Sequence, residues 1–202
     1  MNKKDALYFE QFEKDIEKEL DICKISDFPI SDFPFKNLDD VKNAINNKEI
    51  SITAPYSHER MQIYGTKGEK LMYYFWLTMP MIIIMTNILL AIITKRWIFI
   101  VGVIFSLIGF FTSSQLNPLR KSISGLGALS FLASFFLLEW HWSVIIGSLI
   151  FTQIFAMTAR EQYIMTVKQR ALMSETFFCW MLFNFIIFII DNKTGKFLQS
   201  KS

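Results

Sequence analysis

The sequence is poor in the residues that usually build catalytic and metal-binding sites. Its 202 residues contain two histidines and two cysteines, Cys23 and Cys179, which lie far apart in the chain. A zinc site needs several Cys or His ligands at short spacings, so we expect no metal site and no disulfide framework. Both cysteines are expected to be reduced, which fits a cytosolic N-terminal segment.

The motifs of several enzyme classes are incomplete. Residues 122–125, Ser-Ile-Ser-Gly, lack the first glycine of a serine-nucleophile turn, and residues 65–70 and 193–196 lack the spacing of a phosphate-binding loop. We therefore predict no catalytic residues and no cofactor, which favours a non-enzymatic role. The net charge of +3 is too small to indicate a nucleic-acid partner.

Apolar residues, by contrast, are abundant and form long runs. Hydrophobic residues make up 52% of the chain and are concentrated in residues 71–190, whereas residues 1–70 are rich in charge. No charged residue lies near the middle of a long apolar run. This pattern predicts an all-α polytopic membrane protein with four to five transmembrane helices in hairpins. Residues 1–70 are expected to form a small cytosolic segment of α/β or mainly helical structure.

The candidate transmembrane segments are about 71–94, 97–113, 123–139, 142–158 and 172–190. A single helix over the first two would be about 60 Å long, roughly twice the hydrocarbon core, so the chain must reverse at Lys95-Arg96. The same argument places a second hairpin tip at residues 139–142. The apolar part of the fifth segment is short, so a crossing there must include Glu175 near one end. Residues 191–202 are expected to form a polar tail.

The basic residues near these segments predict the orientation in the membrane. If all five segments cross, eight lysines and arginines lie on the N-terminal side and five on the opposite side. Because positively charged loops tend to stay in the cytoplasm, we expect a cytosolic N-terminus and an external C-terminus. We expect insertion into a bacterial inner membrane without a secretory signal peptide. If the fifth segment does not cross, the C-terminus returns to the cytosol.

Residues 1–70 carry structural signals of their own. Apolar residues at spacings of three and four, from Phe9 to Cys23, predict an amphipathic helix over 5–24. Asn37 is placed to cap a short helix over 38–45. This segment has few apolar residues for an independent domain, so we expect it to pack against another part of the protein or another subunit.

Three further segments are predicted from their local patterns. Residues 49–53 are expected to form a strand, and residues 60–64 and 69–73 a β-hairpin. Segment 159–171 is amphipathic and is expected to continue the fourth transmembrane helix into the cytosol. There it would contact residues 1–70.

Polar residues in the apolar segments are the candidate site residues. Three amides near segment centres and one carboxylate near a segment end make up this set: Asn87, Gln153, Asn184 and Glu175. Hydrocarbon supplies no hydrogen-bond partners, so these side chains are expected either to join helices or to line a pore. Glu139 and His141, at the second hairpin tip, form a candidate interface.

A non-enzymatic inner-membrane accessory protein requires no catalytic or metal-binding residues, so this is the function that the sequence favours. It would act by protein–protein interaction, as immunity, exclusion and phage-defence proteins do. Its partners would be the lipid bilayer and either further copies of the chain or another protein, bound through residues 1–70 and 159–171. One alternative is a homo-oligomeric pore or membrane-perturbing effector. Another is a small transporter or a lipid-modifying enzyme.

Overall fold

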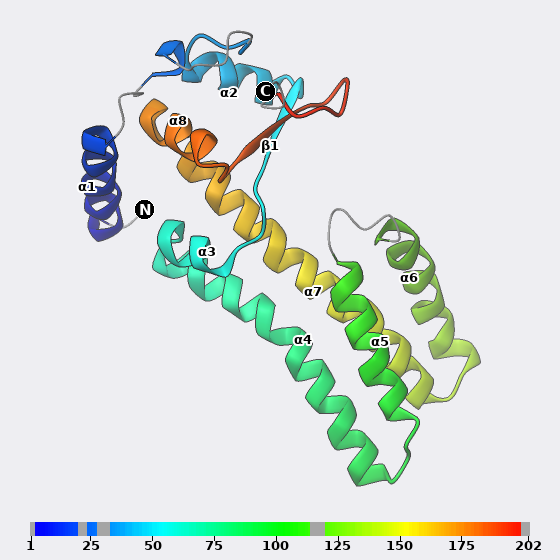
Figure 1. Cartoon of the computed structure of the whole chain (residues 1–202). Helices are drawn as coiled ribbons and strands as arrows, with labels where there is room; N and C mark the ends of the chain where they lie inside the picture. Colours follow the sequence, from blue (N-terminus) through cyan, green and yellow to red (C-terminus); the bar gives the residue numbers. More distant parts are fainter. Residues whose placement is uncertain (1–2, 20–23, 28–32, 114–119, 199–202) are drawn as a thin grey trace. The chain divides into compact units, whose positions relative to one another are not determined.

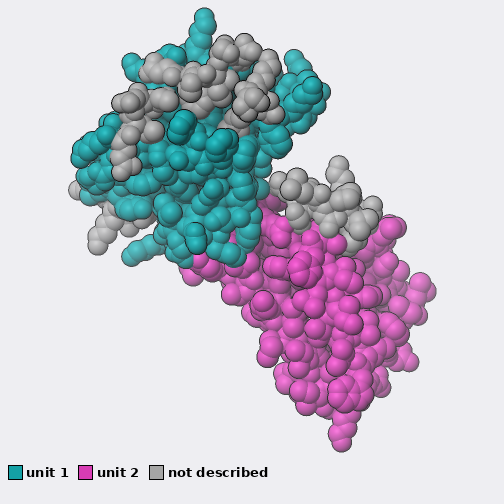
Figure 2. Space-filling view, viewed as in Figure 1, with its two compact units in different colours: residues 1–70, 163–202 teal, residues 71–162 magenta. Residues whose placement is uncertain are grey.

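The computed structural model describes residues 3–19, 24–27, 33–113 and 120–198 (Figure 1). These residues form eight α-helices, one 3-10 helix (Ile25–Asp27) and two short strands. The chain divides into two compact units: unit 1 contains residues 1–70 and 163–202, and unit 2 contains residues 71–162 (Figure 2). The boundary expected near residue 70 is present. Residues 163–190, however, belong with the N-terminal residues rather than with the apolar helices.

Unit 2 is built from helices that follow one another in hairpins. They are α4 (Lys67–Thr94), α5 (Phe99–Thr112), α6 (Arg120–Leu137) and α7 (Trp140–Ala171). Helix α4 begins in unit 1, and α7 ends there. Lys95 has a φ of 55°, and this left-handed residue ends α4 at the predicted reversal. The second reversal follows Leu137, close to the tip expected from the sequence.

Helices α4 and α7 are the two described helices that are long and apolar enough to cross a membrane. Only 17% of the most apolar 18-residue window of α4 is buried, whereas the core helix of a soluble protein is mostly buried. Helix α5, with 14 residues, extends about 21 Å, less than the ~30 Å hydrocarbon core. The structure thus has two helices of crossing length where the sequence predicted four to five.

Helix α7 is continuous from Trp140 to Ala171. This confirms that segment 159–171 extends the apolar helix before it. The predicted contact with residues 1–70 is also confirmed, since the Tyr163 hydroxyl donates a hydrogen bond to the Pro55 carbonyl at 2.7 Å. The C-terminal turns of α7 therefore belong to the core of unit 1.

The helix predicted over 172–190 is wrong. The structure has a nine-residue helix, α8 (Glu175–Phe183), and then strand β2 (Phe188–Asp191), both in unit 1. Phe185, with a φ of 53°, ends α8 in the left-handed conformation. The amide of Ile186 donates to the Met181 carbonyl at 2.8 Å, and that of Phe185 donates to the Leu182 carbonyl at 3.2 Å. These two bonds form a Schellman motif, which satisfies the last carbonyls and turns the chain away.

Strand β2 pairs with β1 (Ile50–Thr53) in an antiparallel sheet of two strands. Ile52 lies opposite Ile189, and both side chains are buried. The isoleucines that follow α8 suit a strand because β-branched side chains favour extended backbone. The strand expected over 49–53 is confirmed, but its partner comes from the segment predicted to cross the membrane.

The polar tail begins with a turn that belongs to the same sheet. The Asp191 carboxylate accepts hydrogen bonds from the Lys193 amide and the Thr194 hydroxyl, each at 2.8 Å. These donors hold the pKa of Asp191 below its usual value. Asn192 accepts a hydrogen bond from the Ser51 hydroxyl at 2.8 Å, which ties the turn to β1.

The β-hairpin predicted from residues 60–64 and 69–73 is also wrong. These residues lie in helix α3 (His58–Tyr64) and in the first turns of α4. The amide of Thr66 donates to the Glu69 carboxylate at 2.7 Å, and the amide of Glu69 donates to the Thr66 hydroxyl at 3.3 Å. This reciprocal pair is a capping box, so the Thr-x-x-Glu spacing starts a helix where the neighbouring glycines suggested a turn.

The other predicted helices of unit 1 are present as α1 (Lys3–Glu19) and α2 (Leu38–Asn46). Asn37 caps α2, accepting a hydrogen bond from the Asp40 amide at 2.9 Å. Phe9 of α1 is buried, and its ring centroid lies 6.3 Å from that of Phe177 in α8. Cys23, predicted on the same apolar stripe, lies outside the described residues.

Arg170, near the end of α7, joins several elements of unit 1. Its side chain is 8% exposed, and it forms an ion pair with the Glu69 carboxylate at 2.7 Å. Its Nε donates to the Tyr64 carbonyl at 2.9 Å, and its guanidinium carbon lies 4.6 Å from the centre of the Phe9 ring. Burial alone would raise the pKa of Glu69, which precedes the apolar part of α4. The donors of Thr66 and Arg170 outweigh it and hold that pKa below its usual value.

We expect Arg170→Met to lower the free energy of unfolding of unit 1 by about 3 kcal/mol, because it leaves the Glu69 carboxylate largely buried without its cation. Thermal unfolding of the full chain in detergent, followed by circular dichroism, measures the loss. The matched control is Lys14→Met, which removes an exposed ion pair with Glu10 and should change stability little. Equal unfolding midpoints for the two variants would contradict the role assigned to Arg170.

Candidate functional site

A buried polar cluster joins α4 and α7 inside unit 2. Asn87 is 1% exposed, and its Nδ2 donates to the Ser148 hydroxyl at 2.8 Å and to the Ile83 carbonyl at 2.9 Å. The Ser148 hydroxyl in turn donates to the Val144 carbonyl at 2.8 Å. An amide that bridges two apolar helices in this way is the interhelical contact expected of Asn87.

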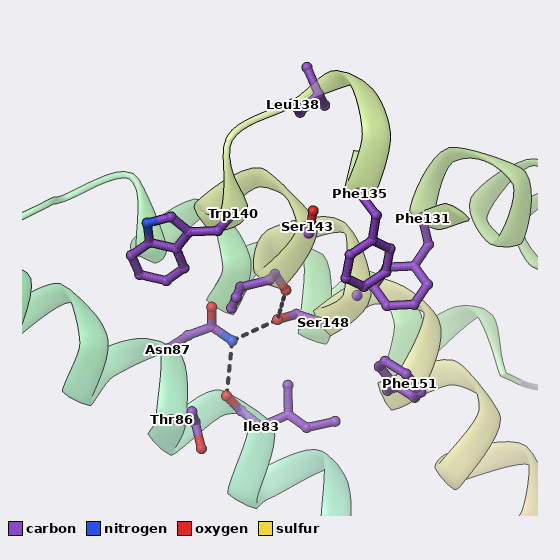
Figure 3. A pocket seen from close by; sticks show the side chains of 12 residues that line it. Ile83, Thr86, Asn87, Phe131, Phe135, Leu138, Trp140, Ser143, Ser148 and Phe151 are labelled. Atoms are coloured by element: carbon purple, nitrogen blue, oxygen red, sulfur yellow. Dashed lines mark hydrogen bonds between the residues drawn. The ribbon is translucent and has the colours of Figure 1, made fainter. Parts of the chain in front are cut away.

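This cluster lies on the wall of a cavity of about 540 Å³ within unit 2 (Figure 3). Figure 3 shows the rings of Phe131, Phe135 and Phe151 together on one side of it. The polar residues of the wall are Thr86, Asn87, Ser143 and Ser148. A mainly apolar wall with a few polar groups is typical of a site for a small apolar molecule.

The polar groups of the cavity are hydroxyls and an amide, which keep their charge state near neutral pH. The Thr86 hydroxyl donates to the Ile82 carbonyl at 2.8 Å, and the Ser134 hydroxyl donates to that of Ser143 at 3.0 Å. In the described part of the chain, no three His, Cys, Asp or Glu side chains are grouped to hold a metal ion. The arrangement is therefore suited to helix packing and to contact with an apolar molecule.

Two glycines of α5 allow its close approach to the neighbouring helices. A methyl group at Gly102 would overlap Oδ1 of Asn87, and one at Gly109 would overlap the Leu149 carbonyl oxygen of α7. That Oδ1 atom is buried and has no hydrogen-bond partner among the described residues. Small residues at such contacts let apolar helices pack backbone to backbone.

The second hairpin tip contains a cluster of charged and titratable side chains. Nδ1 of His141 lies 3.2 Å from Nη1 of Arg96 and 3.3 Å from a carboxylate oxygen of Glu139. His141 is 8% exposed, whereas the Glu139 side chain is 73% exposed. Arg96 and His141 therefore join the two helical reversals of unit 2, and Arg96 and Glu139 are both exposed.

The predicted site residues do not form a single site. Asn87 and Gln153 are buried in unit 2. Glu175 and Asn184 lie at the two ends of α8, whose nine residues are too few for the crossing predicted over 172–190. The Glu175 carboxylate accepts a hydrogen bond from the Ile25 amide at 2.7 Å. Asn184 is exposed and donates to the Trp180 carbonyl at 2.9 Å at the end of α8.

Sequence reasoning missed Ser148 and the aromatic wall of the cavity. A signal for Ser148 was present, because a small polar residue beside Gly147 in an apolar helix is typical of a helix contact. The phenylalanines of the wall carry no such signal, since the sequence has 21 of them. Which of these rings surround a cavity depends on how the helices pack.

Comparisons with known proteins add nothing to this picture. No protein-family model matches the chain, and neither the curated proteins nor the solved structures contain a match to it. The site is therefore interpreted from its own geometry.

We expect Gly102→Ala to destabilise unit 2, because the added methyl displaces the Asn87 amide from its bond to Ser148. We expect Asn87→Ala alone to cost about 1 kcal/mol. In the double variant the methyl group at position 102 no longer meets an amide. Its loss in free energy of unfolding should therefore be smaller than the sum of the losses of the two single variants.

Unfolding in mixed detergent and dodecyl sulfate micelles measures these differences. The matched control is Gly125→Ala, where an added methyl meets open space. Strict additivity of the two losses would show that Gly102 and Asn87 act independently.

Proposed function

We propose that this chain is an integral, multi-pass protein of a bacterial inner membrane and that unit 2 lies in the lipid. Support comes from the side chains that unit 2 leaves uncovered. Each of these aliphatic and aromatic residues is more than half exposed: Ile82, Met85, Ile92, Ile93 and Phe111. In water this surface would be unfavourable by roughly 25 cal/mol per Å², whereas in a bilayer it contacts lipid chains.

The topology that we propose has both ends of the chain in the cytosol. Strands β1 and β2, from opposite ends of the sequence, pair within unit 1, so both ends share one side of the membrane. The number of crossings is then even. Helices α4 and α7 cross the membrane. Helices α5 and α6 lie between them in the chain and form a hairpin that enters the membrane from the outer side and returns to that side. This replaces the five crossings and the external C-terminus expected from the sequence.

The distribution of positive charge supports this topology. Nine lysines and arginines next to α4 and α7 and in the C-terminal tail then lie on the cytosolic side, while Lys95 and Arg96 lie on the other. This bias is larger than the one obtained with five crossings. It follows the rule that basic residues next to membrane helices are retained in the cytoplasm.

A green fluorescent protein fused after Ser202 should therefore be fluorescent, and alkaline phosphatase fused there should be inactive, because the first needs the cytosol and the second the periplasm. Fusions after Arg96 are the control and should give the opposite results. Extraction with alkaline carbonate should leave the protein in the membrane pellet. A phosphatase-active fusion after Ser202, or release by carbonate, would contradict the proposal.

Within this topology we propose a non-enzymatic accessory function, in which unit 1 binds another protein, as immunity, exclusion and phage-defence proteins do. The turn after α8 carries this proposal. Phe185 is 63% exposed and has a positive φ, which costs a residue other than glycine roughly 1–2 kcal/mol. A strained backbone that presents an aromatic ring to solvent is typical of a contact site. Phe183 beside it is 49% exposed.

The main alternative, a homo-oligomeric pore, has less support. Asn87 and Gln153 are each 1% exposed, so these amides are covered within one copy of unit 2. A pore formed by several copies would need polar side chains directed towards a shared axis. The amides are better accounted for as helix contacts.

The variant Phe185→Gly separates strain from contact. Glycine relieves the left-handed strain, so we expect stability to rise by about 1 kcal/mol. Loss of the ring should weaken the partner complex, measured as the mass of the detergent-solubilised particle and the stoichiometry of co-purified protein. Phe136→Ala removes an exposed ring of unit 2 and is the control that should keep the complex.

Two outcomes would contradict the accessory function. One is a particle that contains this chain alone. The other is a ring of identical copies whose expression depolarises the membrane, which would favour the pore.

A further inference from the structure

Unit 1 contains a second cavity, of about 470 Å³, which has no part in the function proposed above. It lies among the segment before α3, helix α3 itself and the end of α8. The residues of its wall that carry polar or aromatic groups include Tyr56, Glu59, Arg60, Tyr64, Trp180 and Asn184. Its volume falls in the range of about 300–1,000 Å³ that is typical of sites for small molecules.

Arg60 supplies a positive charge to this cavity that the protein leaves partly unpaired. Its Nη1 atom is buried and has no hydrogen-bond partner among the described residues. Its guanidinium group contacts the Tyr163 hydroxyl, whose own proton goes to the Pro55 carbonyl. No described carboxylate, including the neighbouring Glu59, forms an ion pair with it. Arg60 as a whole is only partly buried and lines the cavity, so the charge of its guanidinium group is available to an anion there.

Aromatic rings accompany this charge. Tyr56 is 38% exposed, and its ring centroid lies 5.4 Å from that of Tyr163. Tyr64 and Trp180 pack edge to face, with centroids 6.3 Å apart. Burial raises the pKa of the Tyr64 hydroxyl well above its usual value, so that group remains a neutral donor. Rings of this kind bind the flat, apolar part of a ligand.

We propose that this cavity binds a small aromatic anion, whose carboxylate or phosphate group accepts hydrogen bonds from Arg60 and whose ring lies against the aromatic wall. A guanidinium group suits both oxyanions, since its planar N–H groups match their geometry. The aromatic wall distinguishes such a molecule from a bare inorganic ion. Asn184 and Ile186 of its wall flank Phe185, but Phe185 itself does not line the cavity, and the site does not depend on the membrane assignment.

Titration of the full chain in neutral detergent tests the proposal, with phenyl phosphate as the probe and phosphorus NMR as the readout. Phenyl phosphate should bind more tightly than inorganic phosphate, and benzylamine, a cation of similar size, should not compete. Arg60→Gln should weaken binding of phenyl phosphate by at least about tenfold, because a charged hydrogen bond is lost. Lys42→Gln, on α2, is the control that should bind normally.

Tyr56→Ala provides a second test that does not remove the charge. It should lower the affinity for phenyl phosphate towards that for inorganic phosphate, while the affinity for inorganic phosphate stays the same. Unchanged binding in Arg60→Gln, with the thermal midpoint of the native chain, would overturn the site. Tighter binding of short-chain phosphatidylglycerol than of phenyl phosphate would overturn the aromatic anion in favour of a lipid headgroup.

Discussion

The ion pair between Arg170 and Glu69 is the interaction on which unit 1 depends. Arg170 lies in the last turn of α7, a helix of 32 residues, and Glu69 lies in the first turn of α4, a helix of 28 residues. The same guanidinium group also binds the end of α3 through the Tyr64 carbonyl and lies over Phe9 of α1. One largely buried charge therefore orders elements that are distant in sequence. Its cost of burial is offset because each donor described here has a defined acceptor.

Unit 2 depends on a different constraint, the close approach of its helices. Apolar helices in lipid gain little from hydrophobic burial against one another, so packing and interhelical hydrogen bonds decide their association. Gly102 and Gly109 remove the side chains that would separate α5 from its neighbours. Asn87 and Ser148 then add a directed bond between α4 and α7. The aromatic rings around this bond leave a cavity rather than filling the space.

Under the topology proposed above, the two units meet two different solvents. Unit 1 keeps most of its charged side chains at the surface and buries isoleucines of its strands, which suits water. Unit 2 exposes aliphatic side chains and directs polar groups such as the Asn87 amide nitrogen to partners inside the unit, which suits hydrocarbon. Two features of unit 1 depart from good packing and pairing at its surface, the exposed Phe185 ring and the unpaired Nη1 of Arg60. It is these exceptions, rather than the well-packed regions, that point to partners.

Much of this protein follows from the sequence alone. Hydropathy and charge determined the apolar region, both helical reversals and the continuous helix through residues 159–171, because these depend on local composition and on helix length. Asn87 and Gln153 could be selected for the same reason, since an amide within an apolar run has few local alternatives. Asn37 as a cap is likewise a local feature.

Only the tertiary structure decided the conformation of residues 172–190, a short helix followed by a strand. An apolar run of that length is compatible with a membrane helix or with a short helix and a strand, and the pairing with β1 lies some 140 residues away in sequence. Local patterns carry no information on such a partner, because backbone hydrogen bonds between strands do not depend on side-chain identity. The Arg170 network and both cavities are hidden for the same reason: they form only where distant segments meet.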